Sequence, residues 1–202
     1  MGLFWRSKRE AWELLCEEIG ASYIYNGMFQ ADMVEFNYKN WVIIMDTFSR
    51  GSGKSRTTFT RVRLNYVKNI AFELEIFPQN FLMELGKIFG AQDMELGEPE
   101  FDEKFMVKSN EVFLFADLLA NQRLKYLLHQ QRYFILRIGE NYSNFPHSID
   151  DIYLIYYHAR GTITDPQRLR DLFDLFTEII ETLVEMEVAE PYAIEPRETN
   201  MD

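Results

Sequence analysis

Apolar residues recur every three or four positions in two segments of this chain, which predicts two amphipathic helices. The first helix is predicted over residues 8–19, where Trp12, Leu15, Cys16 and Ile19 share one face and Gly20 follows as a stop signal. The second helix is predicted from Pro166, with Asp165 as its N-cap. Its buried face is formed by Leu169, Leu172, Phe173, Phe176, Ile180 and Leu183.

Alternating apolar and polar positions predict strands along most of the remaining chain. These strands are expected at residues 31–38, 41–49, 56–66, 71–77, 104–108, 133–139 and 152–160. The first two are separated only by Lys39 and Asn40, which predicts a hairpin. Both sides of the strand 41–49 are apolar, so we expect this strand to be central and covered on both faces.

The middle of the chain predicts two further helical segments. Pro78 is expected to open a short helix that ends at Gly90, before an acidic loop over residues 93–103. Ser109 or Asn110 is expected to cap a second helical segment, which reaches about residue 129 and is interrupted near residue 121.

These elements predict one α+β domain over residues 1–186, followed by a polar, flexible tail over residues 187–202. Its mainly antiparallel sheet is expected to have six to seven strands, packed with N-terminal, middle and C-terminal helices. The apolar fraction of 47% and the aromatic fraction of 15% are too high for a disordered chain.

The net charge of −11 argues against nucleic acid as a partner, because phosphate binding needs clustered cations. A single cysteine, Cys16, excludes an intrachain disulfide and a cysteine-based zinc site. The sequence has no secretory signal and no apolar run long enough to predict a transmembrane segment, so a cytoplasmic location is expected. The oligomeric state stays open.

Two motifs resemble binding loops but lack the required context. Residues 51–55, GSGKS, contain the end of a phosphate-binding loop, but Phe48 occupies the position of its first glycine and β-forming residues follow. We therefore expect a hairpin connection here. The acidic loop has Gly97 where a calcium loop needs a ligand, so we expect solvated carboxylates. The sequence predicts no catalytic, cofactor-binding or metal-binding residue.

Positive charge nevertheless gathers on one hairpin of this acidic chain. The candidate partner-binding residues are Arg50, Lys54, Arg56, Arg61 and Arg63. One interpretation is a solvated edge whose charges prevent pairing between sheets. The other is a docking patch for an anionic protein surface, a phosphate or anionic lipid head groups.

Three segments together resemble a bacterial family of soluble α+β proteins that has no established activity. They are NWVIIMDTFSRGSGKSRTTFTRVR, IFPQNFLMELGKIFGAQDMELGEPEFDEKFMVKSN and GTITDPQRLRDLFDLF, and they cover most of residues 40–180. The string FGAQDMELGEPEFDEKFMVKSN is the most specific part of this resemblance. The resemblance implies one cytosolic domain and supplies no catalytic residues.

The first functional hypothesis is therefore a non-enzymatic cytosolic binding or adaptor module that acts through its basic hairpin. An alternative is a protein that holds a small apolar or amphipathic ligand among its 17 Phe and 11 Tyr side chains. A third hypothesis, a hydrolase that uses paired carboxylates, rests only on the abundance of Asp and Glu.

Overall fold

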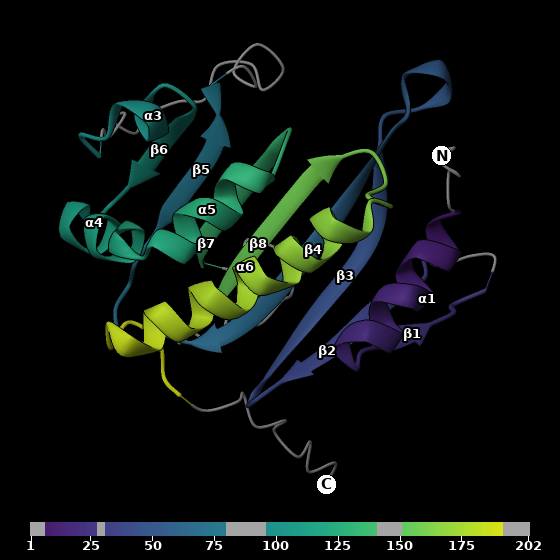
Figure 1. Ribbon diagram of the computed structural model, residues 1–202, viewed down its shortest axis with the longest axis horizontal. Coiled ribbons are helices and arrows are strands. Elements are labelled where there is room, and N and C mark those ends of the chain that lie inside the picture. Colours follow the sequence, from purple (N-terminus) through teal and green to yellow (C-terminus); the bar gives the residue numbers. More distant parts are fainter. Residues whose placement is uncertain (1–6, 28–30, 80–95, 141–150, 192–202) are drawn as a thin grey trace, which may run out of the picture.

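The computed structural model describes residues 7–27, 31–79, 96–140 and 151–191. These residues form one antiparallel sheet of eight strands in the order β1-β2-β3-β4-β8-β7-β5-β6 (Figure 1). The strands are β1 (Ser22–Ile24), β2 (Met33–Tyr38), β3 (Trp41–Arg50), β4 (Thr57–Val67), β5 (Leu74–Pro78), β6 (Phe105–Ser109), β7 (Phe134–Glu140) and β8 (Ile152–Arg160). The α+β class is confirmed, and the predicted six to seven strands were slightly too few because the short β1 was missed.

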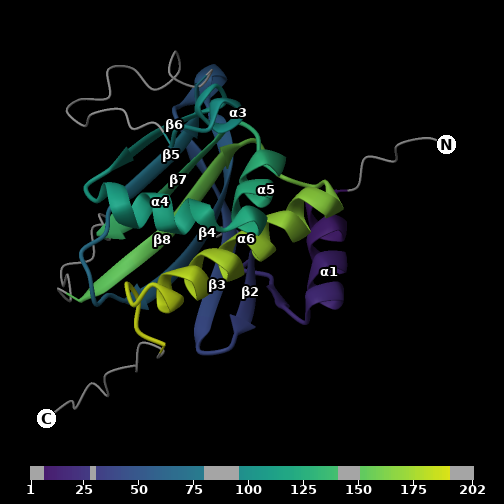
Figure 2. The same ribbon diagram turned by 60° about the vertical axis from the view of Figure 1, so that its left-hand side comes forward.

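The described helices are α1 (Lys8–Ile19), α3 (Pro99–Asp102), α4 (Val112–Ala120), α5 (Gln122–Gln130) and α6 (Pro166–Glu185). Helices α1, α4, α5 and α6 lie on one face of the sheet, and α6 runs across its middle (Figures 1 and 2). None of the helices in the described part of the chain is both long enough and apolar enough to cross a membrane.

Strand β8 occupies the centre of the sheet although it is the last strand in the sequence. Its Ala159 lies opposite Thr60 of β4 on one side and opposite Phe134 of β7 on the other. Strands β1 to β4 are consecutive antiparallel neighbours, whereas β5 lies between β6 and β7. Strand β8 therefore joins two groups of strands into one sheet.

Capping explains the limits of the two amphipathic helices. Ser7 and Glu10 form a capping box at the start of α1, and Gly20 ends the helix with φ of 73°, a conformation that glycine adopts without a steric penalty. The Asp165 side chain accepts a hydrogen bond from Arg168 N at the start of α6, and Pro166 occupies the first turn. Both predicted helices are confirmed.

The core lies between the helices and the sheet and consists largely of aromatic and branched side chains. Its largest fully buried side chains include Trp12, Tyr66, Phe72, Tyr157 and Phe176. The indole Nε1 of Trp12 donates to Ile163 O at 3.0 Å, which fixes α1 against the turn before α6. Burial of Trp12 together with this hydrogen bond joins the N-terminal helix to the C-terminal part of the chain.

The structure corrects several boundaries in the middle of the chain. Pro78 is the last residue of β5, one residue beyond the predicted strand, and the helix predicted after it falls on residues 80–90, which lie outside the described part. The interruption near Asn121 is confirmed, since its side chain caps α5. Neither Ser109 nor Asn110 caps α4; Ser109 Oγ donates to Glu73 O at 2.8 Å and thereby ties β6 to the chain before β5.

Two expectations about coverage also change. Strand β3 lies inside the sheet as predicted, but Val42 is 42% exposed, so the strand is not covered on both faces along its whole length. The predicted tail begins with buried residues, because Val188 and Ala189 pack against the core. Residues 192–202 lie outside the described part of the chain.

Candidate functional site

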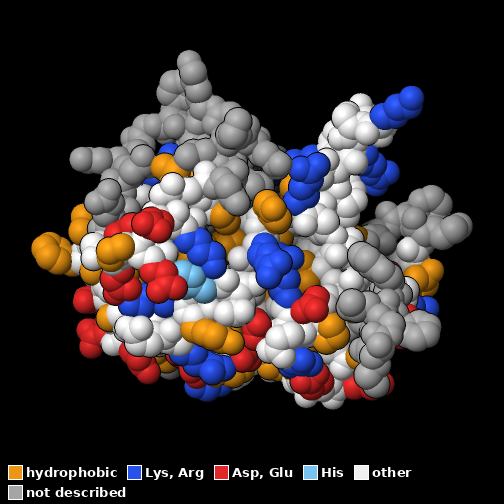
Figure 3. Space-filling model, turned by 45° about the horizontal axis from the view of Figure 1, so that its top comes forward, with side chains coloured by type: hydrophobic (Ala, Val, Ile, Leu, Met, Phe, Trp, Pro, Cys, Tyr) orange, Lys and Arg blue, Asp and Glu red, His pale blue; other side chains and the backbone are white. Residues whose placement is uncertain are grey.

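The long β3–β4 hairpin stands out from the body of the molecule, with Lys and Arg side chains at its end (Figure 3). A single 3-10 turn at Gly53–Ser55 connects the strands, which confirms a hairpin where the GKS motif raised the possibility of a phosphate loop. Gly51 has φ of 86°, and a Cβ there would lie 2.6 Å from Ser55 O. Glycine at residue 51 is therefore what allows the tip to fold so tightly.

The structure divides the five predicted residues into two groups. Arg50, Lys54 and Arg56 lie at the tip, where all three are exposed. None of the three forms an ion pair with a carboxylate in the described segments. Arg61 and Arg63 instead lie along β4 and bind a carboxylate of the same hairpin.

That carboxylate belongs to Asp46, which lies opposite Arg61 in the β3–β4 register. Arg61 Nε donates to Asp46 Oδ1 at 2.8 Å and its second nitrogen donates to Oδ2 at 2.6 Å. Arg63 donates to the same Oδ2 at 2.8 Å. Two guanidinium groups share one carboxylate, so this group of three keeps one net positive charge.

Aromatic rings surround these charges on the side of the sheet opposite the helices. Phe48 stacks on Phe59 with a centroid distance of 5.2 Å. The guanidinium carbons of Arg50 and Arg61 lie 5.4 and 5.2 Å from the centroid of the Phe48 ring, within the range of cation–π attraction. The rings thus hold the two arginines near the surface of the sheet.

The neighbouring strands extend this surface with residues that the sequence analysis missed. His158 of β8 lies opposite Arg61, and its ring makes edge contacts with Phe59 and Tyr156. Burial, and then the charges of Arg137, Arg50 and Arg61, lower the pKa of His158 to about 4. A neutral imidazole therefore lies among cations at neutral pH.

Arg137 of β7 lies one strand further and donates to Glu75 Oε1 of β5 at 2.6 Å. Alternation in the sequence marks Arg137 as outward-facing, but its place beside His158 depends on strand order. The sequence does not reveal that order. Arg137 and His158 become neighbours only because β8 pairs with β4 on one side and with β7 on the other.

The acidic loop is more structured than expected in its described part. Glu98 accepts two hydrogen bonds from Lys125 Nζ, at 2.7 and 2.8 Å, while its side chain stays 50% exposed, so the predicted contact with solvent is retained. Asp102 accepts hydrogen bonds from the backbone N–H groups of Leu96 and Gly97. Protein groups thus satisfy both carboxylates.

Acid–base and metal chemistry find little support in the described residues. Among the described residues, the buried carboxylates are those of Asp46 and Asp171. They lie on opposite sides of the sheet, because Asp171 belongs to α6, whereas Asp46 faces away from the helices. In the same segments, no group of three or more His, Cys, Asp or Glu side chains is arranged to hold a metal ion.

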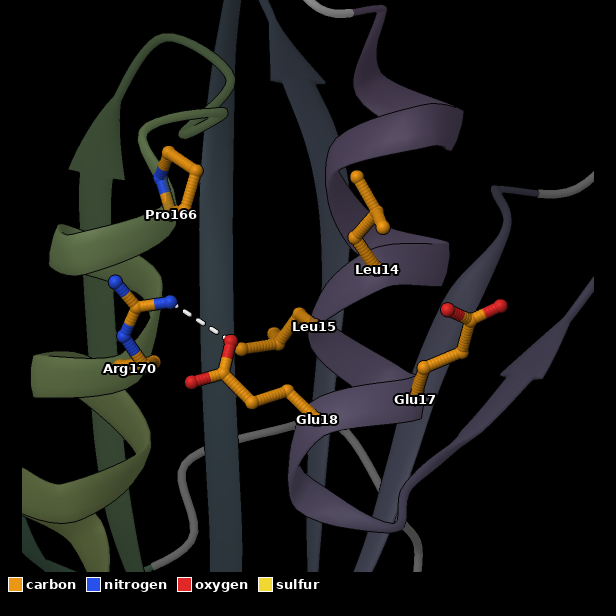
Figure 4. A pocket seen from close by; sticks show the side chains of 6 residues that line it. All are labelled: Leu14, Leu15, Glu17, Glu18, Pro166 and Arg170. Carbon is orange, nitrogen blue, oxygen red and sulfur yellow. Dashed lines mark hydrogen bonds and ion pairs between the residues drawn. The ribbon is translucent and has the colours of Figure 1, made fainter.

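A shallow hollow of about 340 Å³ separates α1 from the start of α6 (Figure 4). Arg170 and Glu18 point toward each other across it and form an ion pair of 2.7 Å. Leu14, Leu15 and Pro166 supply the apolar part of its wall. Arg170 is already paired with Glu18, and Glu17 adds a second carboxylate, so the hollow offers less to an anionic ligand than the basic hairpin does.

No family model, no curated protein and no solved structure matches this chain. The resemblance over residues 40–180 therefore stays a prediction.

Proposed function

We propose that this chain is a non-enzymatic binding module whose β3–β4 hairpin binds an acidic segment of a protein partner. The observation that carries this proposal is the tip of the hairpin, where Arg50, Lys54 and Arg56 are exposed and without ion pairs to the described carboxylates. A cluster of cations on a projecting element attracts an acidic surface over several ångströms and steers its approach.

The base of the hairpin supports the same proposal in a different way. Asp46 holds Arg61 and Arg63 against the sheet, so these two arginines stabilise the hairpin while keeping one net positive charge behind the tip. The side chains of Phe48 and Phe59 add an apolar surface beside the charges. Cations next to partly exposed aromatic rings are typical of protein interfaces.

A cytoplasmic location belongs to this proposal, and Cys16, a buried free thiol, is compatible with it. The alternative of a small apolar ligand has less support, because the largest aromatic side chains fill the core. A carboxylate-based hydrolase has less still, because the two buried carboxylates are separated by the sheet.

Binding to acidic and neutral synthetic peptides tests the proposal, with anionic vesicles and duplex DNA as competing ligands. We expect the wild-type protein to bind the acidic peptide, and this binding should weaken as the salt concentration rises. The triple variant Arg50→Glu, Lys54→Glu, Arg56→Glu should bind the same peptide at least about tenfold more weakly. A matched control, Arg9→Glu, Arg123→Glu, Arg170→Glu, has the same net charge but leaves the hairpin intact.

Equal weakening in both triple variants would show that overall charge, and not the hairpin, determines binding. Preference for vesicles or for DNA over the acidic peptide would also overturn the proposal. Circular dichroism of each variant checks that the fold is retained.

A further inference from the structure

A second hollow, of about 570 Å³, lies at the other end of the sheet from α1 and is independent of the hairpin tip. Three segments that are distant in the sequence form it: the end of β5, the start of β6 and the turn that joins α5 to β7. The polar side chains that line it are Gln79, Glu103, Lys104, Gln131, Arg132 and Tyr133. Its volume falls in the range of small-molecule sites.

Two cations lie together in the wall of this hollow. Lys104 Nζ donates to the carbonyl oxygen of His129 at 2.8 Å and contacts His129 Nδ1 at 3.0 Å. Burial, and then the charge of Arg132, lower the pKa of Lys104. Among the described residues, neither Lys104 nor Arg132 forms an ion pair with a carboxylate. The Glu103 carboxylate also lines the hollow, so the two cations leave one net positive charge there, and this excess favours an anion.

Gln131 adds a hydrogen-bond donor that has no partner. The residue is 1% exposed, and its Oε1 accepts from Tyr157 OH at 3.1 Å and from Arg168 Nε at 3.4 Å. A guanidinium group only donates, so this contact fixes which side of the amide is the oxygen. The remaining atom, Nε2, is buried without a hydrogen bond. An unpaired buried N–H is unfavourable, and because Gln131 lines the hollow, a ligand oxygen bound there would supply the missing acceptor.

The backbone of the turn is held in an unfavourable conformation. Tyr133 has φ of 51°, which is uncommon for an aromatic residue. Arg168 donates to Arg132 O at 2.7 Å and Arg160 N donates to Tyr133 O at 3.2 Å, and these bonds hold the turn in place. The Tyr133 ring remains 56% exposed at the rim of the hollow. Backbone strain of this kind gathers at binding sites.

We propose that this hollow binds a small organic oxyanion, either a phosphate ester or a carboxylate. Arg132 and Lys104 hold the charged oxygens, Gln131 Nε2 donates to one of them, and the uncharged part of the ligand lies against the Tyr133 ring. Guanidinium groups bind both phosphate and carboxylate through paired hydrogen bonds. The chemistry shared by these ligands is a planar or tetrahedral group of charged oxygens attached to a small apolar body.

Calorimetry with phenyl phosphate, benzoate and phenol at constant ionic strength tests the proposal and separates the two sources of oxyanion. We expect at least one of the two anions to bind about tenfold or more tightly than phenol. Arg132→Gln and Lys104→Gln should each weaken that binding about tenfold, whereas Arg9→Gln on the exposed face of α1 should leave it unchanged.

Gln131→Glu tests the donor, since it replaces the unpaired N–H by a charged acceptor. We expect this variant to lose binding, and unchanged binding would remove Gln131 from the site. Because Gln131 is buried, Arg132→Gln keeps the proposal testable if Gln131→Glu fails to fold. Anions that bind no more tightly than phenol, or wild-type affinity in both Arg132→Gln and Lys104→Gln, would overturn the proposal.

Discussion

Arg61 binds both carboxylate oxygens of Asp46 directly across the β3–β4 register. The same carboxylate accepts from Arg63, two residues further along β4 on the same side of the strand. This arrangement makes Asp46 the residue on which the hairpin's internal charge balance depends. In the described part of the chain, the exposed tip residues Arg50, Lys54 and Arg56 take no part in this balance.

Asp46→Asn should therefore destabilise the protein. The variant leaves two adjacent guanidinium groups without a counter-charge, and we expect the free energy of unfolding to fall by about 2 kcal/mol. This loss is smaller than that for breaking a fully buried ion pair, because both arginines are partly exposed. Urea unfolding at neutral pH measures it. Glu75→Gln, which breaks the more exposed ion pair with Arg137, is the control and should cost less than about 1 kcal/mol. Equal losses in the two variants would contradict this prediction.

His158 should make stability depend on pH. Its pKa is about 4 in the folded protein and about 6.5 when unfolded, so the unfolded chain binds more protons between these values. Stability that is present above about pH 6.5 is therefore lost as the pH falls toward 4. Between about pH 7.5 and 5, we expect this group to account for roughly 2 kcal/mol.

His158→Phe removes the titrating group while keeping an aromatic ring beside Phe48 and Phe59. Urea unfolding of both proteins at the two pH values gives the comparison. The variant should lose less stability than the wild type on acidification, and the same loss in both would show that His158 is not responsible.

Gly51 should tolerate alanine less well than Gly53 does. Both glycines have positive φ, but only at Gly51 would a Cβ meet a backbone atom, Ser55 O. We expect Gly51→Ala to cost about 2 kcal/mol and Gly53→Ala about 1 kcal/mol, the second value being the cost of the backbone conformation alone. Thermal unfolding measures both, and hydrogen exchange at Arg56 N–H, which donates to Gly53 O, locates the effect. A reversed order would show that the tip relaxes around a side chain.

Cys16 should be unreactive while the protein is folded. Burial, and then the charge of Glu13, raise the pKa of its thiol to about 11, and only the thiolate reacts with disulfide reagents. At about pH 8 we expect modification to be at least about 100-fold slower in the folded protein than in denaturant. Fast modification in the folded state would mean that α1 opens readily.

Local patterns predicted most helices and strands, because each has its own periodicity and caps. Helix α1 ends at Gly20 and α6 begins after Asp165, and both signals act within a few residues. Strand β1 was missed because three residues are too few to show alternation. Strand β5 extends one residue further than predicted, to Pro78, because proline is tolerated at the end of a strand.

The candidate sites were harder to predict, because they depend on contacts across the sheet. The sequence identified the cations of the hairpin, but only the register shows that Asp46 binds Arg61 and Arg63 while Lys54 stays exposed. The second hollow combines three distant segments, and nothing near Gln131 in the sequence shows that one of its amide hydrogens is left unpaired.

The central position of β8 has a consequence for biosynthesis. The strand groups β1–β4 and β5–β7 leave the ribosome first, and they are joined into one sheet only when residues 152–160 have emerged. Until then, β4 and β7 each present an unpaired edge to other nascent chains, which is a route to aggregation. A premature stop codon before this strand would release two half-sheets that cannot close on each other.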